Sequence, residues 1–162
     1  MMYNRRVSKC DARVEAYGSV DELNAALGVA RASVRRESVS RQLEAVQADL
    51  IGLMGELATH PDDLERYARE GYLRLDPRAV QRLEEWATEA EAEPAMPRGW
   101  ATPGKSPEAA ALDLARTVCR RAERRVCALL EAGQVSCGPM LEYLNRLSDL
   151  LWLHARQVES GG

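Results

Sequence analysis

The sequence predicts an all-α fold, an antiparallel bundle of five helices. The 162 residues include 24 Ala and 20 Leu but only 12 Val, 4 Thr and 1 Ile, so helix-favouring residues far outnumber β-branched ones. Apolar residues recur at three- and four-residue intervals in five segments, and no competing strand pattern is present. The length fits one domain, residues 1–162, with a sizeable core.

The first two predicted helices cover residues 20–34 and 43–57, each with an apolar stripe at helical spacing. Ser19 and Glu22 have the spacing of a capping box, which predicts that the first helix starts there. Asp21 would then lie in the first turns of that helix, where its carboxylate could partner a cation.

The other three predicted helices follow turn-rich stretches. The third comes after Asp76-Pro77 and the fourth after Ser106-Pro107, each pair offering a cap followed by proline at the first helical position. The fourth runs to residue 129, and the fifth covers 140–158. The connection 94–107 holds four prolines and two glycines around Trp100, and ordered loops of this length are often functional.

Composition excludes several classes of protein. The net charge is −3 without a basic tail, which argues against nonspecific nucleic-acid binding. The four cysteines form no CxxC pair and only two histidines accompany them, so zinc-ribbon and thioredoxin-like sites are excluded. No apolar run approaches the roughly 18 residues of a membrane span, and no signal peptide opens the chain. We therefore expect a cytoplasmic protein that binds neither membranes nor nucleic acid.

The fourth predicted helix concentrates positive charge. Residues 116–125 contain five arginines and one glutamate, in a chain that is acidic elsewhere. Arg116, Arg120 and Arg124 follow one another at four-residue steps and share a face, which is unfavourable unless acidic partners or an anion offset the repulsion. Forked guanidinium groups suit phosphate oxygens. Two interpretations stay open here, an anion site or a solvated face with surface ion pairs.

The fifth predicted helix carries a polar stripe beside its apolar seam. Asn145, Ser148, Asp149 and Trp152 follow helical spacing. Asn and Ser are poor helix formers, so their presence mid-helix indicates that their side chains are in use. A hydrated face and an interhelical hydrogen-bond network are equally good explanations. From the residues alone, the prediction is a helical bundle with an arginine-lined anion site.

Three segments closely resemble the PduO-type ATP:cob(I)alamin adenosyltransferases: RVEAYGSVDELN at 13–24, RTVCRRAERR at 116–125 and YLNRLSD at 143–149. Residues 6–9 and 55–58 match as well, and all follow one another in family order. The resemblance implies a five-helix bundle assembled as a homotrimer, with ATP and the corrinoid bound at subunit interfaces. It also implies transfer of the 5′-deoxyadenosyl group of ATP to the cobalt of cob(I)alamin, with release of triphosphate.

The resemblance further implies roles for individual residues. The implied ATP contacts are Lys9, Arg120, Arg121, Glu123, Arg124 and Asn145. Among these, Arg120, Arg124 and Asn145 are the implied catalytic residues, and Glu123 is the implied Mg²⁺ ligand. Trp100 and Ser148 are the implied corrinoid contacts, and Trp100 stands where the family has a phenylalanine. Asp21 and Arg116 resemble a pair that forms a salt bridge across the subunit interface.

Physical chemistry agrees with this use of arginine. Displacement at the ribose 5′ carbon expels a highly charged triphosphate, which fixed guanidinium groups and Mg²⁺ stabilise without reorganising. Reduced cobalt supplies the nucleophile, so the protein need not. The resemblance implies a cobalamin reductase or an adenosylcobalamin-dependent mutase as a partner.

One departure from the family motivates an alternative function. The family's Thr/Gly-rich phosphate-wrapping segment would end where this sequence starts. We expect either that the true start lies upstream, or that the domain lacks the segment and its turnover is impaired. The alternative is a corrinoid-binding paralogue or carrier with weak or lost ATP-dependent catalysis. A purely structural bundle, with the arginines in surface ion pairs, is the third hypothesis.

Overall fold

A computed structural model describes residues 1–92, 101–135 and 139–160 and contains six α-helices and two short 3-10 turns in these ranges. The helices are α1 Ala12–Ser33, α2 Glu37–Leu57, α3 Leu64–Arg69, α4 Ala79–Glu91, α5 Pro107–Glu131 and α6 Met140–Ser160. The 3-10 turns are η1 Met2–Asn4 and η2 Pro61–Asp63. No described residue lies in a strand, and no helix among them is long and apolar enough to cross a membrane.

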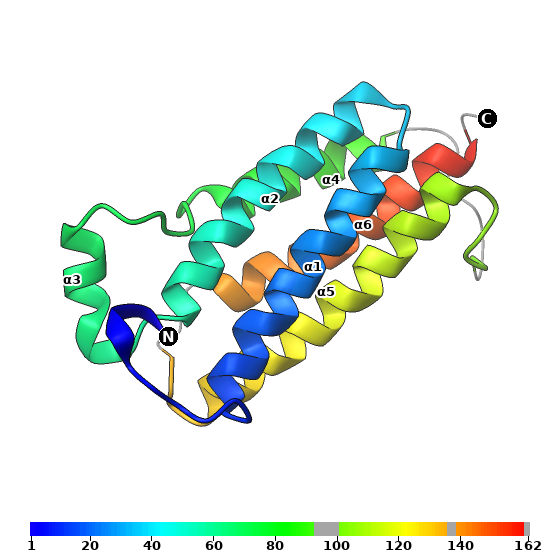
Figure 1. The fold of residues 1–162 in the computed structure, drawn as a ribbon. Coiled ribbons are helices and arrows are strands. Elements are labelled where there is room, and N and C mark those ends of the chain that lie inside the picture. The colour runs from blue at the N-terminus through cyan, green and yellow to red at the C-terminus, as the bar shows by residue number, and fades with distance from the viewer. Residues whose placement is uncertain (93–100, 136–138, 161–162) are drawn as a thin grey trace.

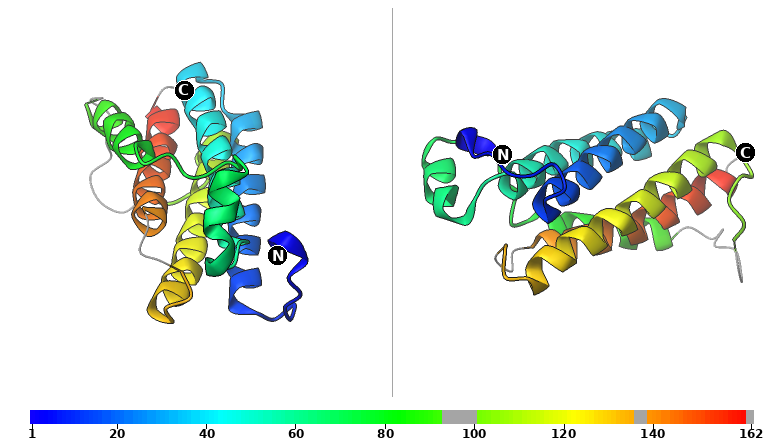
Figure 2. Two further views of the ribbon diagram at one scale, coloured as in Figure 1. Left: turned by 90° about the vertical axis from the view of Figure 1, so that its left-hand side faces the viewer. Right: turned by 60° about the horizontal axis from the view of Figure 1, so that its bottom comes forward.

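Four long helices, α1, α2, α5 and α6, form an elongated bundle (Figure 1). α5 packs between α1 and α6, α2 packs on α1, and the shorter α4 packs on α6. α3 projects from one end of the bundle, beside the N-terminal segment (Figures 1 and 2). The predicted all-α class is confirmed, and each of the five predicted segments corresponds to an observed helix. The predicted count of five is wrong, because α3 is a sixth helix among the described residues. Its six residues are too few to show an apolar period.

The predicted apolar stripes meet in one core. Leucines from α1, α2, α5 and α6, such as Leu27, Leu50 and Leu112, are fully buried. Tyr143 on α6 is also buried, and its hydroxyl donates to Asp49 Oδ2 on α2 at 2.8 Å. Burial and this carboxylate raise the pKa of Tyr143 well above its usual range. The same Oδ2 accepts from Arg82 Nη2 on α4 at 2.5 Å, so one carboxylate joins three helices.

The start of α1 differs from the prediction. Asp11 is the N-cap, and its side chain accepts from the backbone N–H of Arg13 at 2.8 Å. Ser19 is therefore buried inside the helix, where its hydroxyl donates to the Glu15 carbonyl at 2.8 Å. The predicted capping box is wrong because this bond within the helix satisfies the hydroxyl. Asp21 accordingly lies in the middle of α1 rather than in its first turns.

The other two predicted starts agree more closely. Ser106 Oγ accepts from the backbone N–H of Ala109 at 3.1 Å, with Pro107 at the first position of α5, as expected. Asp76 Oδ1 accepts from the backbone N–H of Arg78 at 2.8 Å, but α4 begins only at Ala79. Asp76-Pro77 thus forms a turn that leads into the helix.

Gly52 marks a close approach between α2 and the segment before α4. A Cβ at this position would lie 2.6 Å from the backbone carbon of Arg74 and 2.8 Å from its oxygen. We therefore expect Gly52→Ala to lower the free energy of unfolding by about 1–3 kcal/mol, measured in urea. Gly28→Ala in α1 is the control, because its Cβ would meet only the Gln47 side chain at 3.6 Å. Equal effects of the two substitutions would contradict this close approach.

Candidate functional site

The arginines of α5 are held in different ways. Arg121 forms an ion pair with Glu22 of α1. Arg125 Nη2 lies 3.3 Å from Oε1 of Glu15, about two turns nearer the start of α1. Arg124 is exposed and has no ion-pair partner among the described residues. Surface ion pairs therefore account for part of the cluster, and Arg124 remains available for an anion.

Glu123 joins Arg120 on its own helix to Asn145 on α6. Its Oε1 accepts from Asn145 Nδ2 at 3.0 Å, and its Oε2 lies 2.9 Å from Arg120 Nη1. The Glu123 side chain is only 14% exposed. The structure thus brings three of the predicted site residues into one contiguous set, which we call the α5–α6 constellation: Arg120, Glu123 and Asn145.

Ser148 contacts the backbone of one member of this constellation, Asn145. Its side chain is buried, and its hydroxyl donates to the Asn145 carbonyl at 2.8 Å. Asp149, by contrast, is exposed. Asn145 and Glu123 form a hydrogen bond between helices, while Asp149 faces solvent. The polar stripe is therefore partly an interhelical hydrogen-bond contact and partly a hydrated face.

Arg116 has a separate environment from the other arginines. Its Nε donates to Asp113 Oδ1 at 3.0 Å, and Asp113 Oδ2 accepts from Arg156 Nη2 at 2.5 Å. Asp21 is exposed on α1 and has no ion-pair partner in the part of the chain that the structure describes. Asp21 and Arg116 are thus not paired within one chain, and the pairing expected between subunits stays a prediction.

Lys9 and Trp100 are the two remaining predicted contacts. Lys9 is exposed in the segment before α1, where it forms no ion pair with a described residue. Trp100 lies outside the described residues. Further along the same connection, Lys105 Nζ lies 3.8 Å from Glu159 Oε2, which joins the entry of α5 to the end of α6.

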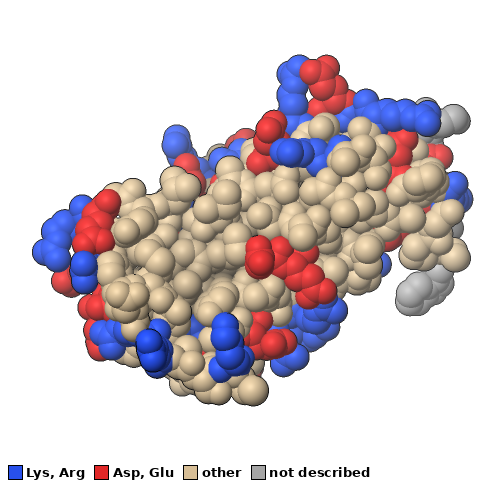
Figure 3. Space-filling model, in the orientation of Figure 1, with Lys and Arg blue, Asp and Glu red and all other residues tan. Residues whose placement is uncertain are grey.

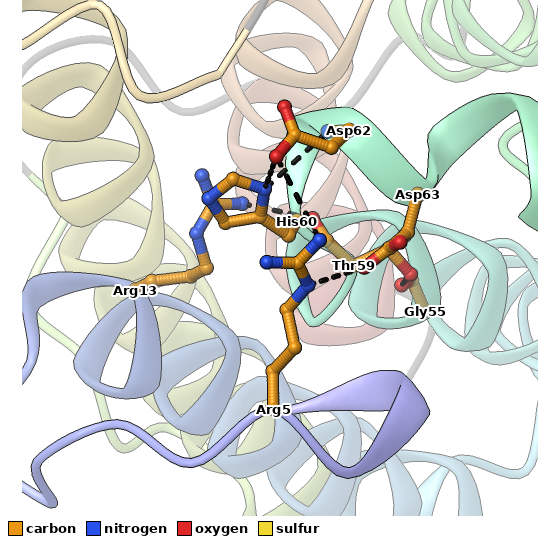
Figure 4. Close-up of polar contacts among 7 residues, drawn as sticks. All are labelled: Arg5, Arg13, Gly55, Thr59, His60, Asp62 and Asp63. Atoms are coloured by element: carbon orange, nitrogen blue, oxygen red, sulfur yellow. Dashed lines mark hydrogen bonds and ion pairs between the residues drawn. The ribbon is translucent and has the colours of Figure 1, made fainter.

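Arg13 is buried, and no role was predicted for it from the sequence. Its Nη1 donates to the carbonyls of Leu57 at 3.1 Å and Thr59 at 3.2 Å, and its Nη2 donates to the carbonyl of Gln134. Burial lowers the pKa of the Arg13 guanidinium. Arg13 therefore satisfies carbonyls at the end of α2 and joins them to the turn after α5; Arg13 and Thr59 are among the residues drawn in Figure 4.

The donor set around Glu123 is compatible with magnesium bound together with phosphates. Mg²⁺ usually takes one or two protein carboxylates and fills its other positions with substrate phosphates and water. Glu123 Oε2 is buried, and its contact among the described residues is the ion pair with Arg120 Nη1 at 2.9 Å, so a bound cation would share this carboxylate with Arg120. Across the described residues, no group of three or more His, Cys, Asp and Glu could hold a metal on its own.

Comparison with known proteins decides the family. Residues 1–158 match the family model described as cobalamin adenosyltransferase. The chain belongs to the cobalamin adenosyltransferase family. A corrinoid adenosyltransferase from Mycobacterium leprae is 40% identical over 159 residues, which cover 96% of this chain and 83% of the relative. The corrinoid adenosyltransferase PduO of Salmonella typhimurium is 38% identical over 160 residues, 96% of this chain but only 45% of that longer protein.

Solved structures of the family share the fold of this adenosyltransferase chain. A variant of the PduO-type ATP:corrinoid adenosyltransferase from Lactobacillus reuteri, complexed with ATP, superposes with a TM-score of 0.83 at 30% identity. The match covers 97% of this chain and 86% of that structure. A second variant of the same enzyme, complexed with cobalamin and ATP, gives a TM-score of 0.82 at 32% identity, with 94% and 83% covered.

Proposed function

We propose that this chain transfers the 5′-deoxyadenosyl group of ATP to the cobalt of cob(I)alamin and releases triphosphate. The observation that carries the proposal is the α5–α6 constellation, found in a chain of the cobalamin adenosyltransferase family. Solved relatives are complexed with ATP and cobalamin, the two substrates of this reaction.

The reaction is a displacement in which cobalt supplies the electron pair. The new bond forms between cobalt and C5′, while the C5′–O bond breaks and triphosphate departs with that electron pair. Arg120, Arg121 and Arg124 offer the leaving group charged donors on one rigid helix, so the donors need little reorganisation as charge develops. Holding C5′ in line with the nucleophile is the other contribution the chain makes.

Glu123 orients the side chain of Arg120 toward the triphosphate in this proposal. Its contact with Arg120 fixes one guanidinium, and the hydrogen bond from Asn145 fixes the carboxylate against α6. Mg²⁺ bound by Glu123 and the phosphates would neutralise part of the triphosphate charge. Lys9 would approach the nucleotide from the segment before α1, and Ser148 would contact the corrinoid, as would Trp100.

A homotrimer, with the substrates between subunits, is part of the same proposal. Val29 on α1 and Leu114 on α5 expose large apolar side chains, 59% and 57% of their surface. Figure 3 shows broad uncharged areas on the face that carries these two helices. Such a face supports association of copies there, where Asp21 of one subunit could meet Arg116 of another. A cobalamin reductase and an adenosylcobalamin-dependent mutase, and a cytoplasmic location, remain predictions.

An anaerobic spectroscopic assay tests the proposed function. The chain is mixed with MgATP and chemically reduced cobalamin, and we expect the corrinoid spectrum to convert to the adenosyl form only when ATP and protein are both present. A folded chain that binds cobalamin without conversion would instead support the carrier alternative. Loss of all ligand binding would support the purely structural bundle.

A further inference from the structure

The N-terminal segment is fastened to the α3 end of the bundle by contacts from several residues. The backbone N–H of Met2 donates to the Ala58 carbonyl at 2.9 Å, beyond the end of α2. The Tyr3 hydroxyl donates to Glu70 Oε2 at 2.9 Å, just after α3. Arg5 Nε donates to Asp63 Oδ2 at 2.5 Å in η2 (Figure 4).

Further charges reinforce these contacts. Arg5 Nη2 also lies 3.7 Å from Asp62 Oδ2, and the Arg66 guanidinium lies 4.1 Å from the centre of the Tyr3 ring. The hydrogen bond from Arg5 lowers the pKa of the Asp63 carboxyl. Hydrogen bonds from Arg66 and then Tyr3 lower the pKa of Glu70. Both carboxylates are therefore stabilised in the charged form by the segment they hold and by Arg66 of α3.

The backbone of the held segment is in a conformation that needs such support. Tyr3 and Asn4 have φ angles of 55° and 57°, in the left-handed region that non-glycine residues rarely adopt. Residues persist in such conformations when their surroundings over-determine them. The docking on η2 and α3 supplies that constraint.

The surface that receives the segment is itself anchored to the bundle. Tyr67 of α3 is buried, its hydroxyl donates to the Leu73 carbonyl at 2.7 Å, and its ring stacks on Tyr72. Gly55 of α2 leaves the space that the Tyr67 hydroxyl fills, because a Cβ there would lie 2.0 Å from it. Asp63 and Glu70, on either side of α3, are thus attached to a fixed support.

Lys9 lies between this attachment and the start of α1. The backbone N–H groups of Cys10 and Asp11 donate to Ser8 at its hydroxyl and its carbonyl, each at 3.1 Å, and form a tight turn around Lys9. Asp11 then caps α1. The path of the chain through Lys9 is consequently fixed at both ends.

We propose that Asp63 and Glu70 form an acidic clamp that holds residues 2–9 against the bundle and thereby sets the position of Lys9 toward the nucleotide. The two acids are positioning residues that act on ATP through the segment rather than by contact. The proposal rests on the proposed function for the role of Lys9, whereas the clamp itself rests on the contacts above.

The test uses the full chain with Asp63→Asn and Glu70→Gln combined, and Glu65→Gln as the matched control. Glu65 is an exposed acid of α3, between Asp63 and Glu70 in the chain, and makes no ion pair with a described residue. We expect trypsin to cleave after Arg5, Arg6 or Lys9 at least about threefold faster in the double variant, with the control unchanged. Isothermal calorimetry should show MgATP affinity weakened by a similar factor, and the urea midpoint should not move.

A charge swap provides the decisive control. Arg5→Asp combined with Asp63→Arg removes the trypsin site at Arg5, so cleavage after Lys9 is followed instead. That cleavage should be slow again, which general destabilisation would not produce. Unchanged cleavage in the clamp variant would overturn the clamp, and faster cleavage with unchanged MgATP affinity would overturn its effect on Lys9. A wild-type chain that binds no MgATP would refute the proposed function and the positioning of Lys9 together, while cleavage would still decide whether the clamp exists.

Discussion

Replacing Arg124 by glutamine is expected to lower kcat/KM for adenosyl transfer by about 10²-fold or more, because one fixed charged donor to the leaving triphosphate is lost. The same substitution should change the free energy of unfolding by less than about 0.5 kcal/mol. Arg124 is exposed and has no ion-pair partner among the described residues, so the fold does not depend on its charge. Steady-state kinetics and urea unfolding measure the two quantities on the same protein.

Arg125→Gln is the matched control for this prediction. The two arginines are neighbours on α5, and both are exposed. Arg125, however, forms an ion pair with Glu15 at 3.3 Å and is not among the residues implied to contact ATP. We expect its kcat/KM to stay within about threefold of wild type, since an exposed ion pair contributes little. Equal losses of kcat/KM in both variants would mean that the arginine cluster acts only through its overall positive charge. Unchanged kcat/KM in both variants would show that Arg124 is not part of the site.

Asp113→Asn is expected to destabilise the fold by about 3–5 kcal/mol, because it removes one partner from a buried charge cluster. The Asp113 side chain is 4% exposed, and it receives hydrogen bonds from Arg116 and from Arg156, whose side chain is 1% exposed. Arg156 Nη2 also lies 3.2 Å from Glu159 Oε1, a second buried carboxylate. An amide at position 113 leaves Arg156 buried with less opposite charge, which is costly in a poorly hydrated interior.

Arg41→Gln provides the reference for the Asp113 prediction. Arg41 forms an ion pair with Glu37 one turn earlier on α2, and both side chains are more than 70% exposed. Its loss should change the free energy of unfolding by less than about 0.5 kcal/mol. Urea titrations monitored by circular dichroism compare the two variants. A small effect of Asp113→Asn would show that solvent reaches the cluster.

The fold was largely predictable because the apolar period is a local property of the sequence. The period located five helices through residues such as Leu27, Leu50 and Leu147, which are all buried. It could not locate α3, since six residues complete fewer than two turns and its one buried side chain is Tyr67. The start of α1 was misplaced because Ser19 and Glu22 fit a cap pattern that Asp11 satisfies eight residues earlier.

The candidate site was predictable where it depends on one helix and not where it depends on packing. The spacing of Arg120 and Glu123 already places them together. Asn145 was implied by the family resemblance, and the structure supplies its contact with Glu123 from another helix. Arg13 and Arg156 showed no sign of burial in the sequence, because the Leu57 carbonyl that Arg13 contacts and the Asp113 carboxylate that Arg156 contacts lie more than 40 residues away. A buried arginine is recognisable only once the carbonyls or carboxylates around it are in place.

The most direct test of the central claim is identification of both products from isotopically labelled ATP. The chain is incubated anaerobically with MgATP labelled with ¹³C in its adenosine and with cob(I)alamin, and the products are separated and weighed by mass spectrometry. The proposed reaction predicts adenosylcobalamin that carries the label, formed together with an equal amount of intact triphosphate. Unlabelled or unchanged cobalamin, or ATP converted to ADP and phosphate instead, would contradict it.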